Sequence, residues 1–426
     1  MDTLFSESLL HGESKQDSLL PKCAACKRCV HHTPNKIEFD GKGRKGIMVI
    51  IPSPTKERIE CGKDRLLAHH FRRFGIDLDR DCWIAYSYGC YGPGDRKSRD
   101  LARKSCRPLL IQAIKKLKPK VIIPIGWEAT HSLLSWTWRN STGRPEALVG
   151  QKIPDRKLNA WICPTYDFID LRKSDWKNQL KNKAGNRFIV EALKLKNRPW
   201  KGKAPSLEDE IETEMHPRKG ARLLRDAYRA ALDVDAFATF DYEGNALKPE
   251  YKGARLYSVA FCFGFEGHRI SIACPWSPEI AKVTKEILTG PLRKIAAGLK
   301  FEDRWSQYFL KAPVNNWFYC TQTASHILDS RDGVTGLKFQ AYTLLGIPDY
   351  NAHVEPYFQQ TSTGRLNRID QIDMGELLIY NAKDSLIEDM VARIQMKELF
   401  GEVPYGKTKP DRRNDRKGQR SKRPKR

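Results

Sequence analysis

Four carboxylates and one tyrosine in the C-terminal half of the chain have the types and spacing of a metal-dependent hydrolytic site. They are Asp241 and Glu243 in Phe-Asp-Tyr-Glu, Glu302 in Lys-Phe-Glu-Asp, and Tyr380 and Asp384 in Tyr-Asn-Ala-Lys-Asp. Carboxylates beside apolar segments are costly to bury unless their charge is compensated. Two divalent cations on a carboxylate cluster would compensate it, and they are the apparatus of phosphodiester cleavage. The pattern therefore predicts a nuclease.

The expected elements bring these side chains into reach of one another. Asp241 and Glu243 lie two residues apart at the end of an apolar strand, so they point to one face. Tyr380 and Asp384 lie four apart on a helix, so they share a face one turn apart. Glu302 opens another helix. Hard carboxylate oxygens suit Mg²⁺ or Mn²⁺ better than zinc. Each carboxylate taken singly is also compatible with an ordinary surface ion pair.

The surrounding segments predict a domain of mixed strands and helices. A helix is expected over 221–232, followed by three consecutive strands over 237–242, 256–263 and 268–273. Helical patterns dominate from residue 302 onward, and the last helix runs over 374–399. Strand ends and helix starts are thus expected to supply the acidic side chains.

Residues 233–400 resemble the 3′–5′ proofreading exonuclease domain of family A DNA polymerases, in the form with a tyrosine in the third motif. The three motifs correspond to Phe-Asp-Tyr-Glu-Gly-Asn-Ala-Leu-Lys-Pro, Gly-Leu-Lys-Phe-Glu-Asp-Arg-Trp and Tyr-Asn-Ala-Lys-Asp-Ser-Leu. Gly-Leu-Lys-Phe-Gln-Ala-Tyr-Thr-Leu-Leu-Gly at 336–346 is similar to the connecting helix of phage versions. The resemblance implies a ribonuclease H-like fold with a mixed sheet, and removal of nucleoside monophosphates from single-stranded 3′ ends of DNA.

The resemblance also implies roles for the residues. Two Mg²⁺ or Mn²⁺ ions would be held by Asp241, Glu243, Glu302 and Asp384, and Tyr380 would orient the attacking water. The chain departs from the family at three positions. Gly298 stands where the family usually has Asn, and Cys320 replaces a common Asp. Glu302 takes the place of the Asp in the second motif, with Asp303 as the alternative ligand.

The first part of the chain alternates apolar strands with helices. Strands are expected over 46–51, 83–88, 121–125 and 160–163, with helices between them, for example over 107–117. Strands and helices in this order favour an α/β sheet with helical cover.

Cysteines in this part have metal-ligand spacing. Cys23, Cys26 and Cys29 form Cys-x2-Cys-x2-Cys, and Cys90 and Cys106 follow. Thiolates at such spacing bind zinc or an iron–sulfur cluster. Unpaired reduced cysteines are the simpler alternative. Four further cysteines lie in or beside apolar runs and are expected in the core: Cys163, Cys262, Cys274 and Cys320.

Residues 20–196 resemble the iron–sulfur uracil-DNA glycosylases. The matching segments are Cys26-x2-Cys29 with Gly-Lys-Gly at 41–43, Ser-Tyr-Gly-Cys-Tyr-Gly-Pro-Gly-Asp-Arg at 87–96, and Cys106-Arg-Pro-Leu-Leu. The resemblance implies a three-layer α/β/α domain with a central parallel sheet. It also implies a four-iron four-sulfur cluster, or zinc, on Cys26, Cys29, Cys90 and Cys106, with Cys23 as the alternative first ligand.

The base-recognition residues of that family are missing. Its acidic loop corresponds to 51–55, Ile-Pro-Ser-Pro-Thr, its Asn to Tyr86, and its His-Pro-Ser to 167–169, Asp-Phe-Ile. A flipped uracil needs hydrogen bonds to its edge, so a degenerate glycosylase domain that binds or docks on DNA is expected. Trp127, Trp136 and Trp138 lie among basic residues and have the side chains to stack on unpaired bases. A core role for them is the alternative.

Charge indicates a polyanionic partner. The 426 residues carry a formal net charge of +24, and the segment 406–426 contains eleven Lys or Arg against two Asp. Many basic residues displace counterions from nucleic acid, so DNA is the expected partner and the tail is expected to be disordered. No apolar run has the length of a membrane span, and the start lacks the features of a secretory signal. A cytoplasmic protein is expected, in the host cytoplasm if it is phage-encoded.

These patterns divide the chain into a loose leader (1–20), a glycosylase-like domain (21–196), a linker (197–220), an exonuclease domain (221–402) and a basic tail (403–426). The leading hypothesis is a 3′–5′ exodeoxyribonuclease that proofreads in trans for a DNA polymerase. Two alternatives remain open. One is an active uracil-DNA glycosylase with a trimming exonuclease, and the other is a non-catalytic DNA-binding scaffold of the replication machinery.

Overall fold

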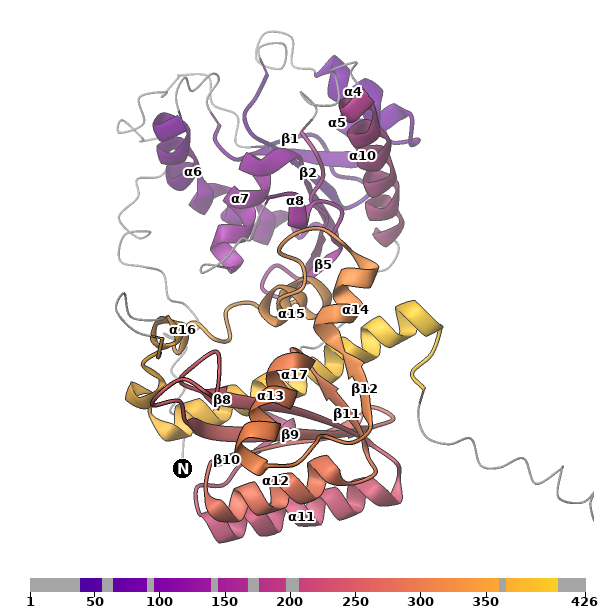
Figure 1. The fold of residues 1–426 in the computed structure, drawn as a ribbon. Coiled ribbons are helices and arrows are strands. Elements are labelled where there is room, and N and C mark those ends of the chain that lie inside the picture. Colours follow the sequence, from indigo (N-terminus) through magenta and orange to yellow (C-terminus); the bar gives the residue numbers. More distant parts are fainter. Residues whose placement is uncertain are drawn as a thin grey trace, which may run out of the picture. The chain divides into compact units, whose positions relative to one another are not determined.

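The computed structural model describes residues 39–55, 64–89, 96–138, 145–167, 176–196, 207–359 and 365–404. The chain forms two compact units, which are described separately (Figure 1). Unit 1 comprises Met1–Lys203 with Ala341–Asp349, and unit 2 comprises Ala204–Gln340 with Tyr350–Arg426. Each unit contains one six-stranded sheet with both parallel and antiparallel neighbours, so the expected α/β class is confirmed.

The sheet of unit 1 has the strand order β1-β3-β2-β4-β6-β5. Its strands are β1 (Phe39–Asp40), β2 (Ile47–Ile51), β3 (Cys82–Tyr86), β4 (Val121–Pro124), β5 (Ile153–Asp155) and β6 (Ala160–Ile162). The four central strands are parallel, and the edge strands β1 and β5 are antiparallel to their neighbours. Every residue of β2 and β4 is buried, which explains their continuous apolar sequences, because helices cover both faces of such a sheet.

The helices of unit 1 form the two outer layers. They are α4 (Arg65–Arg72), α5 (Leu78–Asp81), α6 (Arg96–Leu117), α7 (Gly126–Thr137), α8 (Pro145–Leu148) and α10 (Trp176–Leu195). Phe71 of α4 and Ile189 of α10 pack in one core with Val49 and Ile84 of the sheet. Helix α7 packs on β2 and β4 beside α6, and Figure 1 shows this pair on the other side of the sheet. The predicted helix over 107–117 is the C-terminal half of α6.

A segment distant in sequence completes unit 1. Residues Ala341–Asp349 belong to it although the sequence predicted an uninterrupted exonuclease domain over 221–402. The Tyr342 hydroxyl donates a hydrogen bond to Asp155 (3.0 Å), and Arg156 Nε donates one to the Leu345 carbonyl (2.7 Å). The Tyr342 ring lies 5.0 Å from that of Trp138. These contacts depend on tertiary structure, so no local sequence signal marks the segment.

The sheet of unit 2 has the strand order β12-β11-β8-β9-β10-β7. Its strands are β7 (Ile211–Thr213), β8 (Phe237–Gly244), β9 (Leu256–Phe265), β10 (His268–Pro275), β11 (Arg293–Ala296) and β12 (Trp317–Cys320). Strands β8, β9 and β10 form an antiparallel meander, β11 and β12 run parallel to β8, and β7 runs parallel to β10. This is the mixed sheet that the ribonuclease H-like expectation requires.

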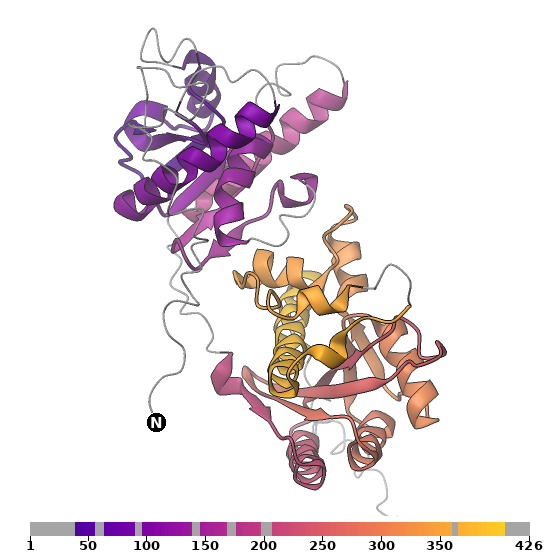
Figure 2. The same ribbon diagram turned by 90° about the vertical axis from the view of Figure 1, so that its left-hand side faces the viewer.

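The helices of unit 2 lie on both faces of this sheet (Figure 2). They are α11 (Pro217–Asp233), α12 (Pro278–Thr289), α13 (Leu299–Leu310), α14 (Thr321–Leu328), α16 (Glu355–Phe358) and α17 (Met374–Phe400), with short 3₁₀ turns η2 (Glu208–Glu210) and η3 (Ile369–Gln371), whereas α15 (Leu337–Leu345) begins in unit 2 and ends in the segment of unit 1. The first two cover one face, and α17 crosses the other. Ala260 and Ala273 of the sheet face Leu378 and Ala382 of α17, so small side chains allow a close approach.

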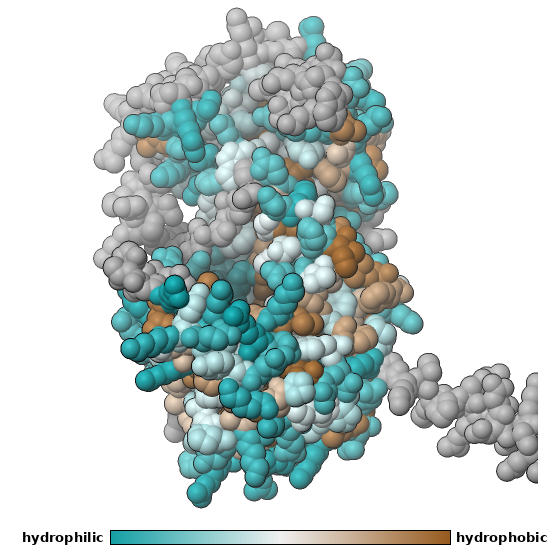
Figure 3. Space-filling view, in the orientation of Figure 1, coloured by the Kyte–Doolittle hydropathy of each residue, from teal (hydrophilic) through white to brown (hydrophobic). Residues whose placement is uncertain are grey.

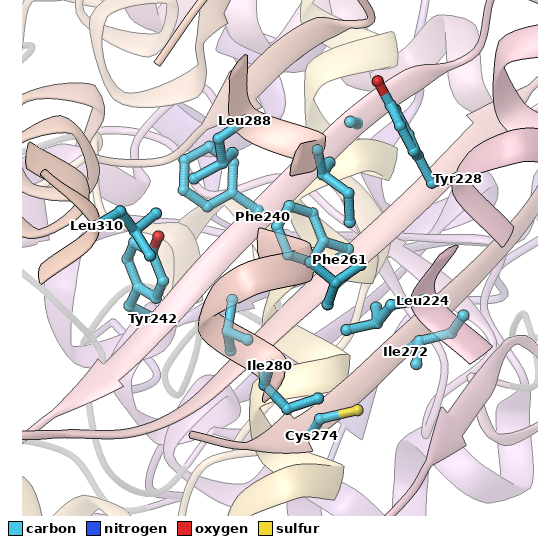
Figure 4. Packing of buried hydrophobic residues seen from close by; sticks show 14 of the residues in the cluster. Leu224, Tyr228, Phe240, Tyr242, Phe261, Ile272, Cys274, Ile280, Leu288 and Leu310 are labelled. Atoms are coloured by element: carbon cyan, nitrogen blue, oxygen red, sulfur yellow. The ribbon is translucent and has the colours of Figure 1, made fainter. Parts of the chain in front are cut away.

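The main core of unit 2 lies between the sheet and the α11–α12 layer. Figure 4 shows Phe240 and Phe261 of the sheet among Leu224 of α11, Ile280 of α12 and their neighbours. The segment expected as a linker, 197–220, ends in β7 and the first residues of α11. Pro217 stands in the first turn of α11, so the helix begins four residues before the apolar pattern that predicted it at Ala221.

The surface of unit 2 has an apolar patch over α14. Ile327 of that helix is 68% exposed, and Figure 3 shows hydrophobic atoms there. Within the described residues, no helix combines the length and apolar character that crossing a bilayer requires.

Candidate metal centre and active site

Three of the predicted carboxylates converge in unit 2. Asp241 and Glu243 come from β8 and Asp384 from α17, and one oxygen of each lies within 4.8 Å of the others. Alternation along β8 turns both of its acids to the face that α17 covers. The Asp373 side chain caps the start of α17 by accepting from the Glu376 N–H. Ordinary secondary-structure rules therefore position the cluster, but its closeness depends on the packing of α17.

The cluster has more negative charge than its neighbours neutralise. Burial, together with the charge of the nearby Asp384, raises the pKa of Asp241 to about 7 against the opposing effect of Lys338. Burial also raises the pKa of Glu243 well above its ordinary value, and the charges of Asp241 and Asp384 add to this. Like charges held this close favour a bound proton or a bound cation. The oxygen-only donor set fits Mg²⁺ or Mn²⁺.

This electrostatic state predicts a pH-dependent cation affinity. A protonated carboxylate does not bind a cation, and the raised pKa of about 7 keeps Asp241 protonated at higher pH than an ordinary Asp. Apparent Mn²⁺ affinity is therefore expected to fall by about tenfold between about pH 7 and about pH 6, and to level off above about pH 8. Calorimetric titration of the metal-free protein with Mn²⁺ across this range measures it. An affinity that does not change below neutral pH would rule out the raised pKa.

Glu302 lies close to this cluster but outside the three-carboxylate group. It stands in the first turn of α13, is 3% exposed and accepts a hydrogen bond from the Tyr242 N–H. Its Oε2 has no hydrogen-bond partner among the described residues. Burial raises its pKa well above the ordinary value, and Asp241 adds to this. Asp303, the alternative in sequence, instead accepts from Gln307 (2.7 Å) and from the Trp317 indole (3.2 Å). The carboxylate oxygens of Asp303 are therefore engaged in hydrogen bonds to other side chains.

Tyr380 is buried one turn before Asp384 on α17. Its ring lies 5.4 Å from that of Phe358 and 6.3 Å from that of Tyr350, centroid to centroid. Burial raises the pKa of its phenol well above the ordinary value, and Asp384 adds to this. The hydroxyl therefore stays protonated near neutral pH and can donate a hydrogen bond.

Three further residues contact the cluster, and the sequence assigned them no role. The Lys338 ammonium contacts both carboxylate oxygens of Asp384, at 2.5 Å from Oδ2, and donates to the Tyr350 hydroxyl (2.9 Å). The Tyr350 hydroxyl in turn donates to Asp384 Oδ1 (2.5 Å). The Asn381 amide donates to Asp241 Oδ2 (2.8 Å). Asn381 lies inside the third motif and Lys338 in the segment that is similar to the connecting helix. Both residues therefore belong to motifs that can be identified in the sequence.

Lys338 is expected to compete with a cation for Asp384. A hydrogen bond to a charged group contributes about 1.5–3 kcal/mol, so Lys338→Met should raise Mn²⁺ affinity by about tenfold. Lys383→Met is the matched control, because Lys383 lies beside Asp384 in sequence but pairs with Glu208 at 3.5 Å. Calorimetry on both variants measures the change. Weaker Mn²⁺ binding by Lys338→Met would mean that the ammonium organises the site instead.

Most of the predicted cysteine site lies outside the described residues. The residues outside the described ranges are Cys23, Cys26, Cys29 and Cys90. Cys106 is described, and it is buried in α6 beside Tyr88 and Ala102. The iron–sulfur or zinc site stays a prediction. Of the cysteines expected in the core, Cys163, Cys262 and Cys274 are buried and Cys320 is partly exposed.

The three tryptophans expected as stacking platforms differ in exposure. Trp138 is 4% exposed, so it has the core role that was the alternative. Trp127 is 37% exposed. The Trp136 ring faces the ammonium groups of Lys115 (5.1 Å) and Lys157 (5.8 Å). Trp136 is partly exposed, so Trp127 and Trp136 both keep some surface in contact with solvent.

Comparison with known proteins gives similarities over parts of the chain. No family model matches the chain. A stretch of 124 residues, 27% of this chain, is 27% identical to a type-4 uracil-DNA glycosylase of Pyrobaculum aerophilum. The match spans 63% of that glycosylase.

Similar solved structures include several nucleases. Brucella melitensis NrnC with bound Mg²⁺ is 18% identical with a TM-score of 0.31, over 45% of this chain and 81% of that chain. Trypanosoma brucei RNase D is 12% identical with a TM-score of 0.34, over 46% and 66%. The exonuclease domain of EXD2 soaked in Mn and GMP is 13% identical with a TM-score of 0.21, over 46% and 100%.

Proposed function

We propose that unit 2 is a divalent-cation-dependent 3′–5′ DNA exonuclease. The observation that carries the proposal is the convergence of Asp241, Glu243 and Asp384 within 4.8 Å, from a strand and a helix about 140 residues apart in sequence. Such a buried group of carboxylates is unfavourable unless a proton or a cation compensates its charge, and the oxygen-only donor set supports a hard cation. The order of the three motifs along the chain supports the same assignment.

The residues present fit a pair of cations. Asp241, Glu243 and Asp384 would hold one ion, and Glu302 with Asp241 would hold the other. Such ions would lower the pKa of a bound water and stabilise the leaving 3′ oxygen. The Asn381 side-chain N–H fixes the Asp241 carboxylate, and the Ser258 hydroxyl donates to the side-chain oxygen Oδ1 of Asn381 (3.1 Å). The protonated Tyr380 phenol orients the attacking water by donating or accepting a hydrogen bond.

The substrate we propose is the single-stranded 3′ end of DNA. The basic chain, with its net charge of +24, supports a polyanionic substrate. Hydrolysis would release nucleoside monophosphates one at a time, in trans with a DNA polymerase as a proofreading or processing activity.

A digestion experiment tests the activity and its direction. Single strands labelled at the 5′ end should give a descending ladder with Mg²⁺ or Mn²⁺, and strands labelled at the 3′ end should release labelled mononucleotide at once. Chelation by EDTA should abolish both. Release of label first from the 5′ end, or digestion of RNA but not DNA, would overturn the proposal.

A glycosylase-like role for unit 1 is the second candidate. The match to a type-4 uracil-DNA glycosylase and the parallel sheet with helical cover support it. We propose that unit 1 is a degenerate member that binds or docks on DNA, and that Cys26, Cys29, Cys90 and Cys106 hold an iron–sulfur cluster or zinc, with Cys23 as the alternative first ligand. Tyr86, in the place of the family's Asn, is 3% exposed and offers no amide edge to a base.

Metal analysis and a base-release assay separate the options for unit 1. The purified protein should be brown and contain iron, and it should release no uracil from uracil-containing DNA. If the protein contains zinc and no iron, the iron–sulfur cluster is excluded and the same cysteines are zinc ligands. Release of free uracil would instead establish an active glycosylase.

A further inference from the structure

Helix α15 and the residues after it connect the candidate cation site to unit 1. Lys338, in the first turn of the helix, belongs to unit 2 and contacts Asp384, whereas Ala341–Asp349 belong to unit 1. The chain returns to unit 2 at Tyr350, whose hydroxyl donates to Asp384 Oδ1 (2.5 Å). The two residues that flank the excursion into unit 1 therefore contact the same carboxylate. Neither the sequence motifs nor the exonuclease proposal explains this arrangement.

Side-chain hydrogen bonds fix the excursion on unit 1. The Tyr342 hydroxyl donates to Oδ2 of Asp155, the last residue of β5 (3.0 Å), and both residues are fully buried. Arg156 Nε donates to the Leu345 carbonyl (2.7 Å). A buried hydrogen bond is costly to break, because each lost partner leaves a desolvated polar group. The excursion is therefore held firmly on the end of β5.

A close backbone contact adds to this anchorage. Gly346 follows the last residue of α15 with a φ of +67°, and its N–H donates to the Tyr342 carbonyl (2.9 Å). Glycine is common in this left-handed conformation at helix ends. A Cβ on Gly346 would lie 2.0 Å from the Pro154 carbonyl oxygen of β5. Only a glycine allows so close an approach, so the end of α15 is fitted tightly to β5.

The helix transmits this anchorage to the cation site. Lys338 and Tyr342 lie four residues apart on α15, about 6 Å along its axis, and share a face. Gln340 between them is buried, and its side-chain oxygen accepts from Gln395 of α17 (2.5 Å). The first turn of α15 is thus held against the helix that carries Asp384. Because a hydrogen-bonded turn moves as a unit, a shift of Tyr342 also shifts Lys338.

We propose that Tyr342 is a positioning residue for the cation site of unit 2. By anchoring α15 on unit 1 it holds Lys338 and Tyr350 against Asp384, and these two side chains compete with a cation for that carboxylate. The inference rests on the cation dependence in the proposed function and adds that unit 1 sets the cation affinity of unit 2. Release of residues 341–349 from β5 frees Asp384 for the ion.

Calorimetric Mn²⁺ titration of paired variants tests the proposal. Tyr342→Phe keeps the ring and removes the hydroxyl, so Lys338 is held less firmly and Mn²⁺ affinity should rise by about two- to fivefold. Tyr88→Phe is the matched control, because the Tyr88 hydroxyl donates to Glu128 in unit 1 over the same 3.0 Å. This control should leave Mn²⁺ affinity unchanged.

Gly346→Ala is a second, stronger perturbation of the anchorage. The added Cβ cannot fit beside the Pro154 carbonyl oxygen, so the end of α15 must leave β5 and Mn²⁺ affinity should rise at least as much as in Tyr342→Phe. Gly333→Ala is its control. Gly333 also has a positive φ (+83°), but an added Cβ there would meet nothing within 4 Å, so Mn²⁺ affinity should stay as in wild type.

A combined variant separates positioning from a general loss of structure. In protein that carries both Lys338→Met and Tyr350→Phe, the further change Tyr342→Phe should alter Mn²⁺ affinity by less than about twofold, because the side chains that transmit its effect are gone. An effect of equal size in both backgrounds, or no effect in either, would overturn the proposal.

Labelling of the Lys338 amine tests the same link without metal. Acetic anhydride should label Lys338 of the metal-free protein faster in Tyr342→Phe than in wild type, as measured by mass spectrometry. Lys383, which pairs with Glu208 (3.5 Å), is the internal reference and should not change. Equal labelling of Lys338 in both proteins would overturn the proposal. Faster labelling in a protein that binds no Mn²⁺ would refute the proposed function and support the anchoring of Lys338 by Tyr342.

Discussion

Replacement of Asp241 by Asn is expected to reduce DNA hydrolysis by at least about 10³-fold. Asp241 shares the three-carboxylate group with Glu243 and Asp384, and its charge also helps to raise the pKa of the buried Glu302. An Asn side chain has the same size as Asp, and its oxygen can still accept the hydrogen bond from the Asn381 amide. It lacks the negative charge that binds cations. The loss should therefore appear in kcat, with the fold unchanged by circular dichroism.

Asp303→Asn is the control for this experiment. Asp303 lies next to Glu302 in sequence, and its oxygens already accept from Gln307 and Trp317, so its replacement should change kcat by less than about threefold. Initial rates on labelled single-stranded DNA at saturating Mn²⁺ provide the comparison. Undiminished digestion by Asp241→Asn, or equal losses in both variants, would show that the cluster is not where hydrolysis occurs.

Phe240→Ala is expected to lower the free energy of unfolding of unit 2 by about 3–5 kcal/mol. The Phe240 side chain is 0% exposed and its ring lies 5.6 Å from that of Phe261 and 5.5 Å from that of Trp317. Alanine would leave a cavity between the sheet and the α11–α12 layer that rigid neighbours cannot fill. Because Phe240 precedes Asp241 on β8, lost packing should also loosen the cluster.

Urea denaturation followed by tryptophan fluorescence measures this loss. Leu247→Ala is the surface comparison, because Leu247 is 66% exposed and its replacement should change stability by less than about 0.5 kcal/mol. A change below about 1 kcal/mol for Phe240→Ala would mean that the core between these layers is poorly packed.

Much of the fold could be predicted from local patterns. The apolar runs that became β2 and β4, and the strand that carries Asp241, are marked by hydrophobicity alone. Short strands could not be predicted where they form only because a neighbouring strand pairs with them. Strand β7, with one partly buried residue and two exposed ones, forms because β10 offers an unpaired edge.

The acidic residues of the site could be predicted from the sequence, but the side chains that contact them could not. Motif spacing gave Asp241, Glu243 and Asp384, since strand and helix periodicity fix which way they point. It could not give Lys338, whose ammonium reaches Asp384 across 46 residues of sequence. The burial of Glu388 could not be predicted either, because an acid on a long helix is as common on a solvated face as in a core. Only the packing of α17 on the sheet decides which acids of this helix are buried.

Anomalous diffraction from crystals grown with Mn²⁺ tests the central claim most directly. The account predicts a manganese peak with oxygens of Asp241, Glu243 and Asp384 at about 2.0–2.4 Å, weakened or absent in Asp241→Asn crystals. Crystals of active protein with no manganese at these three carboxylates, or with manganese bound only at other residues, would contradict it.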